Sequence, residues 1–351
     1  MKQNVIFTND VVTALKQVCD NVEYDKCFVL CDANVEELVL PLLACEIIDE
    51  ATVINIPAGE ENKNLDTLMS VWKSLVDNGA TRHSLLINVG GGVVTDLGGF
   101  AAATYKRGIR FVNIPTTLLC AVDAAVGGKT GVDFAGLKNE VGAFALAEAV
   151  IVSSRFFSTL PREEVLSGYA EMLKLSILDG VEHYNSLAQS DILNCNNDVM
   201  LDMLQRSVAV KQKIVEQDPC ESGLRQVLNL GHTIGHAFES HALLHKRPVR
   251  HGYAVAWGLV CELILSHRLL SFPSHIIYDV AHWVERNYGA YVITCDDYDE
   301  LIALMQHDKK NRDGKIRFAL MSDWGVCEVN REVECNEIEI SLDFYRDLFH
   351  L

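Results

Sequence analysis

The sequence predicts an α/β N-terminal domain with a mostly parallel, Rossmann-like sheet, followed by an α-helical C-terminal domain. Up to about residue 155, short apolar runs alternate with segments of helical periodicity, and from residue 156 onward the pattern is almost entirely helical. Strands that alternate with helices build parallel sheets whose ligands bind at the carboxyl ends of the strands. We therefore expect two domains, at residues 1–155 and 156–351.

Five apolar runs of the N-terminal domain are predicted strands, at residues 26–32, 51–57, 84–90, 109–115 and 149–153. The segments between them are predicted helices, at residues 34–45, 64–79, 93–105 and 116–127. In the C-terminal domain we expect helices at 161–180, 197–218, 224–244 and 251–270, with a late strand at 316–322.

Composition narrows the class of protein. The 351 residues are 49% hydrophobic and 22% charged, as in ordinary globular proteins, and no apolar run reaches the length of a membrane span. The N-terminus lacks the apolar core of a signal peptide, and the 11 cysteines form no CxxC pair, so we expect a cytoplasmic protein with reduced thiols. A net charge of −18 argues against a nucleic-acid partner, so an anionic small-molecule substrate would need local cations.

Polar residues and glycines follow the predicted strands, at the edge where such sheets bind ligands. They are Asp32, Asn34, Glu60, Lys63, Gly91, Gly92, Asp96, Thr116 and Thr117. A glycine run between a strand and a helix lets the backbone approach a pyrophosphate, which the helix N-terminus attracts. The run is not a GxGxxG motif, and a tight turn would explain it equally well.

A glycine-rich segment, residues 121–144, comes after Thr117, overlaps the end of the predicted helix at 116–127 and carries Asp123, Lys129, Lys138 and Asn139. Its low hydrophobicity between well-patterned elements indicates a functional loop. Lysines on such a loop are commonly just solvated, but here they are among the few cations near the proposed nucleotide site.

The segment 218–252 concentrates polar side chains on a predicted helix. Arg225, Asn229, His232 and His236 are spaced by four, three and four residues, which places them on one helical face. A single histidine there would most often be solvated, whereas four polar residues interleaved with apolar ones indicate a site. Two imidazoles suit zinc, but GHTIGH lacks the glutamate of the HExxH signature, so a third ligand must come from elsewhere. The best candidate is Glu171, beside Lys174 on another predicted helix.

Taken together, these segments resemble the 3-dehydroquinate synthases, within the sugar-phosphate cyclases and iron-type alcohol dehydrogenases. The resemblance rests on DAN (32–34), GEENK (59–63), GGGVVTDLGGFAAATYKRG (90–108), PTTLLCAVDAAVGGKTGVDFAGLKN (115–139), GYAEMLK (168–174), ESGLRQVLNLGHTIGHAFE (221–239), RHGYAVAWG (250–258) and DKKNRDG (308–314). It implies an NAD-binding first domain, a metal- and substrate-binding second domain, and a homodimer.

The resemblance also implies residue roles. Glu171, His232 and His251 would bind zinc, with cobalt as the alternative ion. NAD would contact the strand-end residues named above together with Lys138 and Thr159. Substrate contacts would be Arg107 (from the partner subunit), Asp123, Lys129, Asn139, Lys174, Lys211, Arg225, Asn229, His236 and one or both of Lys309 and Lys310. In one departure, Tyr253 stands where many members carry a glutamate, so the surroundings of His251 would differ.

The implied reaction converts 3-deoxy-D-arabino-heptulosonate 7-phosphate to 3-dehydroquinate and phosphate. It combines transient oxidation by NAD, phosphate elimination, reduction and intramolecular aldol closure, in the shikimate pathway of aromatic amino acid biosynthesis. His236 is the candidate for proton transfer, with Glu221 as the second. Three alternatives stay open: a cyclase for another sugar phosphate, a metal-dependent NAD polyol dehydrogenase, and a non-catalytic nucleotide-binding protein.

Overall fold

The computed structural model describes residues 3–306 and 315–351, and the chain forms two compact units. The first unit contains the chain up to Pro161 together with Ile192–Gln212, and the second contains Arg162–Asp191 and Lys213–Leu351. The N-terminal unit therefore includes most of a helix from the middle of the chain. The assignment of a nucleotide-binding role to one domain and a metal-binding role to the other stays a prediction.

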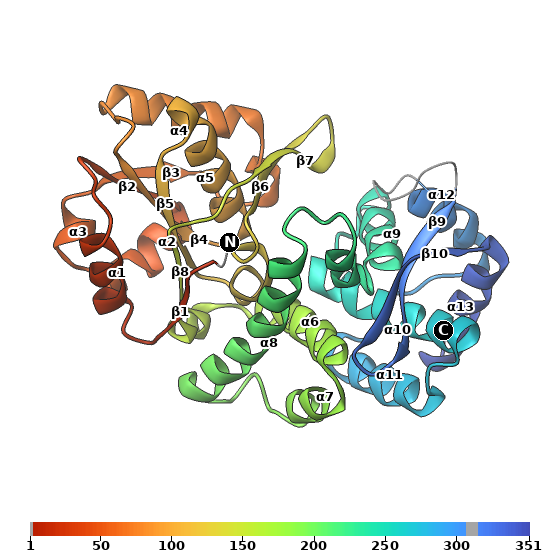
Figure 1. The fold of residues 1–351 in the computed structure, drawn as a ribbon. Helices are drawn as coiled ribbons and strands as arrows, with labels where there is room; N and C mark the ends of the chain where they lie inside the picture. Colours follow the sequence, from red (N-terminus) through yellow and green to blue (C-terminus); the bar gives the residue numbers. More distant parts are fainter. Residues whose placement is uncertain (1–2, 307–314) are drawn as a thin grey trace. The chain divides into compact units, whose positions relative to one another are not determined.

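The first unit is built on a parallel sheet of six strands in the order β1-β8-β5-β4-β2-β3 (Figure 1). The strands are β1 (Val5–Phe7), β2 (Cys27–Asp32), β3 (Thr52–Ile56), β4 (Leu85–Gly90), β5 (Arg110–Pro115) and β8 (Ala149–Val152). The five predicted strands are confirmed within two residues, whereas β1 was not predicted because three residues are too short for a pattern. The order reverses between β2 and β4, the position at which doubly wound sheets bind ligands.

Helices connect the strands and pack on the sheet. They are α1 (Val11–Asp20), α2 (Ala33–Leu38), α3 (Glu46–Asp49), α4 (Leu65–Asp77) and α5 (Gly92–Thr104), with short turns η1 (Leu40–Leu43), η2 (Glu60–Asn62), η3 (Tyr105–Arg107) and η5 (Ser154–Thr159). Helix α4 begins where the Asn64 side chain accepts the N–H of Thr67. Helix α5 lies close against β4 because Gly98 carries no side chain: a Cβ there would fall 2.1 Å from Asn88 Oδ1.

The prediction of a loop at 121–144 is wrong for most of its length. Residues Lys129–Phe134 and Leu137–Phe144 form an antiparallel hairpin, β6–β7, joined by Ala135 and Gly136, which both have positive φ. Such a two-residue turn twists the way a hairpin requires, and alanine at its first position hides the usual Asn-Gly signal. The helical segment before the hairpin is shorter than the predicted range 116–127, and its residues Cys120–Ala124 form the π-helical turn η4.

The second unit is mainly helical, as predicted. Its helices are α6 (Arg162–Asp179), α7 (Val181–Ala188), α9 (His232–Leu244), α10 (His251–Leu270), α11 (Ser274–Tyr288), α12 (Tyr298–Gln306) and α13 (Cys335–Leu348), with turns η6 (Leu224–Asn229) and η7 (Cys295–Asp297). Helix α8 (Asn197–Gln217) begins in the first unit and ends in the second. The predicted late strand is β9 (Ile316–Asp323), which pairs with an unpredicted strand, β10 (Val326–Val333).

Helix α10 is the apolar centre of the second unit. By length and composition alone it could cross a membrane, but 72% of its most apolar window is buried inside the protein. It packs against α6, α9, α11, α13 and β9, as the core helix of a helical bundle does. This burial explains its hydropathy without a membrane.

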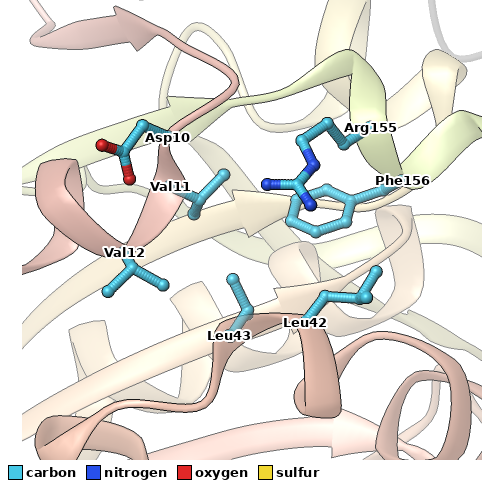
Figure 2. A pocket seen from close by; sticks show the side chains of 7 residues that line it. All are labelled: Asp10, Val11, Val12, Leu42, Leu43, Arg155 and Phe156. Atoms are coloured by element: carbon cyan, nitrogen blue, oxygen red, sulfur yellow. The ribbon is translucent and has the colours of Figure 1, made fainter.

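A small pocket in the first unit lies between the start of α1, η1 and η5 (Figure 2). Val11, Leu42, Leu43 and Phe156 give it an apolar lining, with the side chain of Arg155 beside them. None of the predicted site residues lines this pocket.

Candidate metal and substrate site

The predicted helix at 224–244 is interrupted, which corrects the expectation of one continuous polar face. Residues Leu224–Asn229 form the 3-10 turn η6, Leu230 is extended, and Gly231 is left-handed with φ 79°. Helix α9 then starts at His232. Arg225 and Asn229 therefore do not share a helical face with His232 and His236, although those two histidines do.

A buried carboxylate from α10 replaces the missing N-cap of α9. Glu262 accepts the backbone N–H groups of Gly231 (2.6 Å), Thr233 (2.8 Å) and Ile234 (3.1 Å). A negative charge at a helix N-terminus satisfies unpaired donors and opposes the helix dipole. The interaction fixes the position of His232, and sequence reasoning missed it because Glu262 stands within an apolar run.

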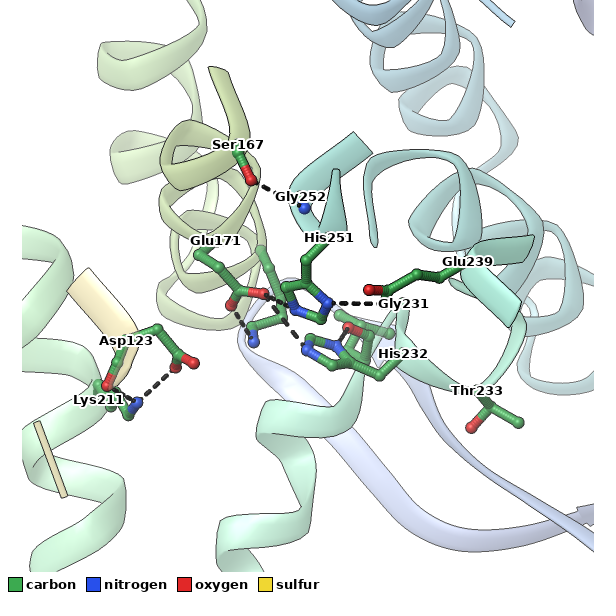
Figure 3. A network of polar contacts seen from close by, with 12 residues as sticks. Asp123, Ser167, Glu171, Lys211, Gly231, His232, Thr233, Glu239, His251 and Gly252 are labelled. Carbon is green, nitrogen blue, oxygen red and sulfur yellow. Dashed lines mark hydrogen bonds and ion pairs between the residues drawn. The ribbon is translucent and has the colours of Figure 1, made fainter. Parts of the chain in front are cut away.

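The three predicted metal ligands lie together. Glu171 Oε1 is 3.3 Å from His232 Nε2 and 3.6 Å from His251 Nε2 (Figure 3). The three candidate ligand atoms are all within 4.8 Å of one another, and Glu171 is fully buried. One carboxylate and two imidazoles directed at a common point are the usual set of a catalytic zinc centre that keeps a position open.

The other ring nitrogen, Nδ1, of each histidine has a hydrogen-bond partner of its own, so Nε2 is the nitrogen directed at Glu171. His232 Nδ1 lies 3.1 Å from the Leu230 carbonyl, which can only accept, so Nδ1 carries the proton. His251 Nδ1 lies 3.1 Å from Glu239 Oε2 (Figure 3). Such outer partners set the tautomer and the ring orientation of metal-binding histidines. Sequence reasoning missed Glu239, although it stands one helical turn after His236.

Lys174 orients the Glu171 carboxylate. One turn further along α6, its ammonium group forms an ion pair with Glu171 Oε2, and Lys174 as a whole residue is 1% exposed. That pairing engages one carboxylate oxygen and leaves Oε1 directed at the histidines. The predicted substrate contact at Lys174 is thus also a direct neighbour of the metal ligands.

The pKa values of the two histidines shift in opposite directions. Burial and the nearby Lys174 cation lower the pKa of His232 to about 3. Burial also acts to lower the pKa of His251, but hydrogen bonds with Glu171 and Glu239 outweigh it and raise that pKa to about 10. A metal that binds here has to displace the proton on His251, so binding strengthens as the pH rises.

The remaining predicted site residues of the second unit lie near these ligands along the chain. The His236 ring is 5.3 Å from that of His232 and 5.9 Å from that of His251, measured between centroids. Asn229 donates to Glu221 Oε1 at 3.4 Å. The buried Arg225 donates to the Pro219 carbonyl at 2.8 Å. The Arg225 side chain thus lies against the 218–223 loop.

In the first unit, the predicted residues do follow the carboxyl ends of β2, β3, β4 and β5. Asp32 ends β2 and caps α2 by accepting the Val35 N–H at 3.0 Å. Gly91 and Gly92 begin α5, where no side chain caps the helix. Thr116 donates its N–H to the Gly90 carbonyl, so the ends of β4 and β5 are joined.

Lys63, a predicted NAD contact of the first unit, binds both another predicted NAD contact and a predicted substrate contact. Its ammonium group lies 2.5 Å from Asp96 Oδ2 and 2.5 Å from Asn139 Oδ1. Burial acts to lower the pKa of Lys63, but Asp96 and other carboxylates outweigh it and raise the pKa. The lysine is therefore charged and connects η2, α5 and the β6–β7 hairpin.

A second ion pair of the first unit joins two predicted substrate contacts. Lys211 of α8 is paired with the Asp123 carboxylate and donates to the Asp123 carbonyl at 2.5 Å (Figure 3). Lys129 and Lys138 are exposed on the hairpin, Arg107 is exposed in η3, and Thr159 is exposed at the end of η5. Lys309 and Lys310 lie outside the described residues.

Tyr253 does not take the place of a carboxylate beside His251. Its ring contacts those of Tyr288 and Trp257, at centroid distances of 4.9 and 5.9 Å. Glu239 from α9 supplies the carboxylate partner of His251 instead. The departure at position 253 thus leaves the ligand with an acidic partner.

Comparisons with known proteins identify the family. Models of the N-terminal and C-terminal parts of 3-dehydroquinate synthase match residues 53–167 and 168–311. The chain belongs to the 3-dehydroquinate synthase family. A curated 3-dehydroquinate synthase of Parabacteroides distasonis is 46% identical over 349 residues, 99% of each chain. That of Pyrococcus furiosus is 40% identical over 331 residues, 93% of this chain and 94% of the relative.

Solved structures agree on the fold of the 3-dehydroquinate synthase family. A 2-epi-5-epi-valiolone synthase from Streptomyces hygroscopicus, with NAD+ and Zn2+ bound, has a TM-score of 0.83 at 25% identity, covering 99% of this chain and 97% of that one. A 2-deoxy-scyllo-inosose synthase in complex with carbaglucose-6-phosphate, NAD+ and Co2+ also gives 0.83, at 22% identity and 97% and 98% coverage.

Proposed function

We propose that the chain is an NAD- and metal-dependent lyase that converts 3-deoxy-D-arabino-heptulosonate 7-phosphate to 3-dehydroquinate and phosphate. The observation that carries the proposal is that Glu171, His232 and His251, from three helices, converge within a chain 46% identical to a curated 3-dehydroquinate synthase. One cyclase of this fold with NAD+ and Zn2+ bound, and another with NAD+ and Co2+ bound, support the two cofactors.

The second unit supplies the metal ligands. Neutral His232 Nε2, His251 Nε2 and Glu171 Oε1 match the donor preferences of zinc, and cobalt accepts the same donors. When bound, such an ion lowers the pKa of a coordinated hydroxyl group. Lys174 holds the Glu171 carboxylate, and Glu239 holds the His251 ring, so both ligands are oriented in advance.

The first unit supplies the nucleotide contacts. The α5 N-terminus begins with Gly91 and Gly92 and has no capping side chain, which suits a pyrophosphate. Further NAD contacts are proposed for Asp32, Asn34, Glu60, Lys63, Asp96, Thr116, Thr117, Lys138 and Thr159. NAD accepts a hydride and returns it in each turnover, so the substrate undergoes no net oxidation.

The substrate carries a carboxylate and a phosphate, and cations of the chain are proposed to bind them. Arg225 suits the carboxylate and Lys129 the phosphate, with Arg107 reaching in from a second copy of the chain. Further contacts are proposed for Asp123, Asn139, Lys211, Asn229 and Lys310. His236 is proposed to transfer a proton, because its ring lies beside both ligand histidines without being one of the metal-binding group. Glu221 is the second candidate.

One assay tests the reaction. The purified protein is incubated with the heptulosonate phosphate, zinc and a catalytic amount of NAD, while released phosphate and absorbance at the NADH band are followed together. We expect phosphate to accumulate far beyond the amount of NAD, with no build-up of NADH. NADH accumulation without phosphate would instead identify a polyol dehydrogenase. Turnover of another sugar phosphate in preference to this one would identify a sister cyclase.

A further inference from the structure

A second cluster of metal-binding side chains lies at the other end of α9. Among the described residues, His241, His245 and Glu300 place one potential ligand atom each within 4.8 Å of one another. His245 Nε2 is 3.0 Å and His241 Nε2 is 3.6 Å from Glu300 Oε2. Asp297 adds an oxygen 3.5 Å from His241 Nε2. All four residues belong to the second unit, and none of them is among the predicted metal, NAD or substrate contacts.

His241 is built into this cluster rather than exposed on the surface. Its side chain is fully buried, and its Nδ1 lies 2.7 Å from the Tyr291 hydroxyl. Its Nε2 is buried and has no hydrogen-bond partner among the described residues. A buried polar atom without a partner costs free energy, so a nitrogen left in this state and directed at two carboxylates points to a ligand.

The separations fit an ion shared by the cluster. Zinc binds imidazole nitrogen and carboxylate oxygen at about 2.0–2.2 Å, so two ligand atoms of a tetrahedron lie about 3.3 Å apart. The distances of 3.0 and 3.6 Å from Glu300 Oε2 bracket that value. The 3.5 and 3.6 Å separations at His241 are long for a hydrogen bond but suit two ligands of one ion.

We propose that His241, His245 and Glu300 form a second binding site for a divalent transition-metal ion of the zinc type. Asp297 stands as a further acceptor, and the half-exposed His245 and Glu300 give the ion access from solvent. The site ties the last turn of α9 to α12. His232 and His241 are nine residues apart on α9, about 14 Å along the axis. The two sites are therefore separate centres and not a two-metal pair, in which the ions lie about 4 Å apart.

The charges around the cluster favour a cation. Two carboxylates face two imidazoles, and among the described residues Arg247 is a cation whose charge acts on His241. Its guanidinium lies over the Tyr291 ring, 4.9 Å from the centroid, and donates to the Val292 carbonyl at 3.3 Å. With neutral imidazoles the group retains a net negative charge even when Arg247 is counted. A divalent ion would neutralise it.

Zinc stoichiometry tests the proposal. The protein is equilibrated with zinc held at micromolar free concentration by a chelating buffer, and bound zinc per chain is measured by mass spectrometry of the metal. We expect two ions in the wild-type chain and one in both His245→Ala and Glu300→Gln. The control His282→Ala, an exposed histidine on α11, should retain two. A wild-type chain that binds one ion, or a second ion that survives His245→Ala, would overturn the proposal.

A second set of variants separates this proposal from the proposed function. His251→Ala should lose the first ion and keep the second, and the double variant with His245→Ala should bind none. Phosphate release by His245→Ala should match the wild type, because no catalytic role rests on that residue. Thermal scans add a readout independent of activity. The second zinc equivalent should raise the Tm of the wild type and not that of His245→Ala, and an equal rise in both would contradict the site.

Discussion

His232 and His236 differ in what their rings face, although they are one helical turn apart. His232 Nε2 is directed at Glu171, whereas the His236 ring lies edge-on to the His232 ring and outside the ligand set. We expect His232→Ala to lose bound zinc. His236→Ala should keep zinc and lose about 10²–10⁴-fold in rate, the usual share of a proton-transfer group. Metal content and phosphate release measured on the same samples decide, and equal metal loss in both variants would mean that the roles are misassigned.

Glu239 acts on the metal site through His251 and not by direct coordination. Its carboxylate holds the His251 ring by Nδ1, at 3.1 Å, and glutamine keeps the shape but removes the charge. We expect Glu239→Gln to weaken zinc binding by about 10–100-fold, the typical effect of an outer partner. Competition with a chelator measures the affinity. Glu182→Gln, an exposed glutamate of α7, is the matched control, and equal affinity in both variants would remove the assigned role of Glu239.

At the level of single residues, ligand identity could be predicted but the surroundings could not. Glu171, His232 and His251 were predicted as a group and do converge. The chain gives no local sign that Glu262 caps α9 from 31 residues away. Partners so distant in sequence are determined by how α9 and α10 pack, which periodicity does not specify. Their roles in binding and catalysis stay predictions until measured.

The element that positions His232 is the break before α9. Gly231 has φ 79°, and a Cβ there would lie 3.1 Å from the Val255 carbonyl and 3.2 Å from Leu259 of α10. We expect Gly231→Ala to destabilise the second unit by about 1–2 kcal/mol from the left-handed backbone, plus about 1–3 kcal/mol from overpacking. It should also weaken zinc binding, because the start of α9 would move away from α10.

A matched glycine separates these two effects. Gly325 has φ 71°, but a Cβ there would meet nothing closer than 3.5 Å. Gly325→Ala should therefore show the backbone cost alone and keep its zinc. Urea denaturation followed by tryptophan fluorescence suits both variants, because Trp257, Trp283 and Trp324 lie in the second unit. Equal loss of stability in the two variants would contradict the proposed contact with α10.

Long, well-patterned elements were predictable and irregular ones were not. Helices α8 and α10 and strands β2 and β4 begin and end within a residue or two of the predicted ranges. The break at Gly231 was missed because Arg225, Asn229, His232 and His236 keep helical spacing across it. The β6–β7 hairpin was missed because its strands are rich in polar residues and glycine, and its turn begins with Ala135 instead of asparagine.

At the scale of the whole chain, the two units are expected to respond to different ligands. The sequence could show that alternating strands and helices give way to a mainly helical pattern near residue 156. It could not show that Ile192–Gln212 packs with the first unit, because an amphipathic helix does not specify which core it covers. Because of that packing, Lys211 lies in the same unit as Asp123, with which it forms an ion pair. Proposed nucleotide contacts thus lie in one unit and proposed metal ligands in the other.

Hydrogen exchange with each ligand alone tests this division. NAD should slow exchange at the carboxyl ends of β2 and β4 and at the start of α5, whereas zinc should slow exchange in α6, α9 and α10. A ligand at 100 times its Kd stabilises the unit that binds it by about 2.7 kcal/mol, enough to slow exchange through unfolding about 100-fold. NAD protection confined to α9 and α10, or zinc protection confined to the sheet, would refute the division, because the strand-end residues and the Glu171 group would then bind something else.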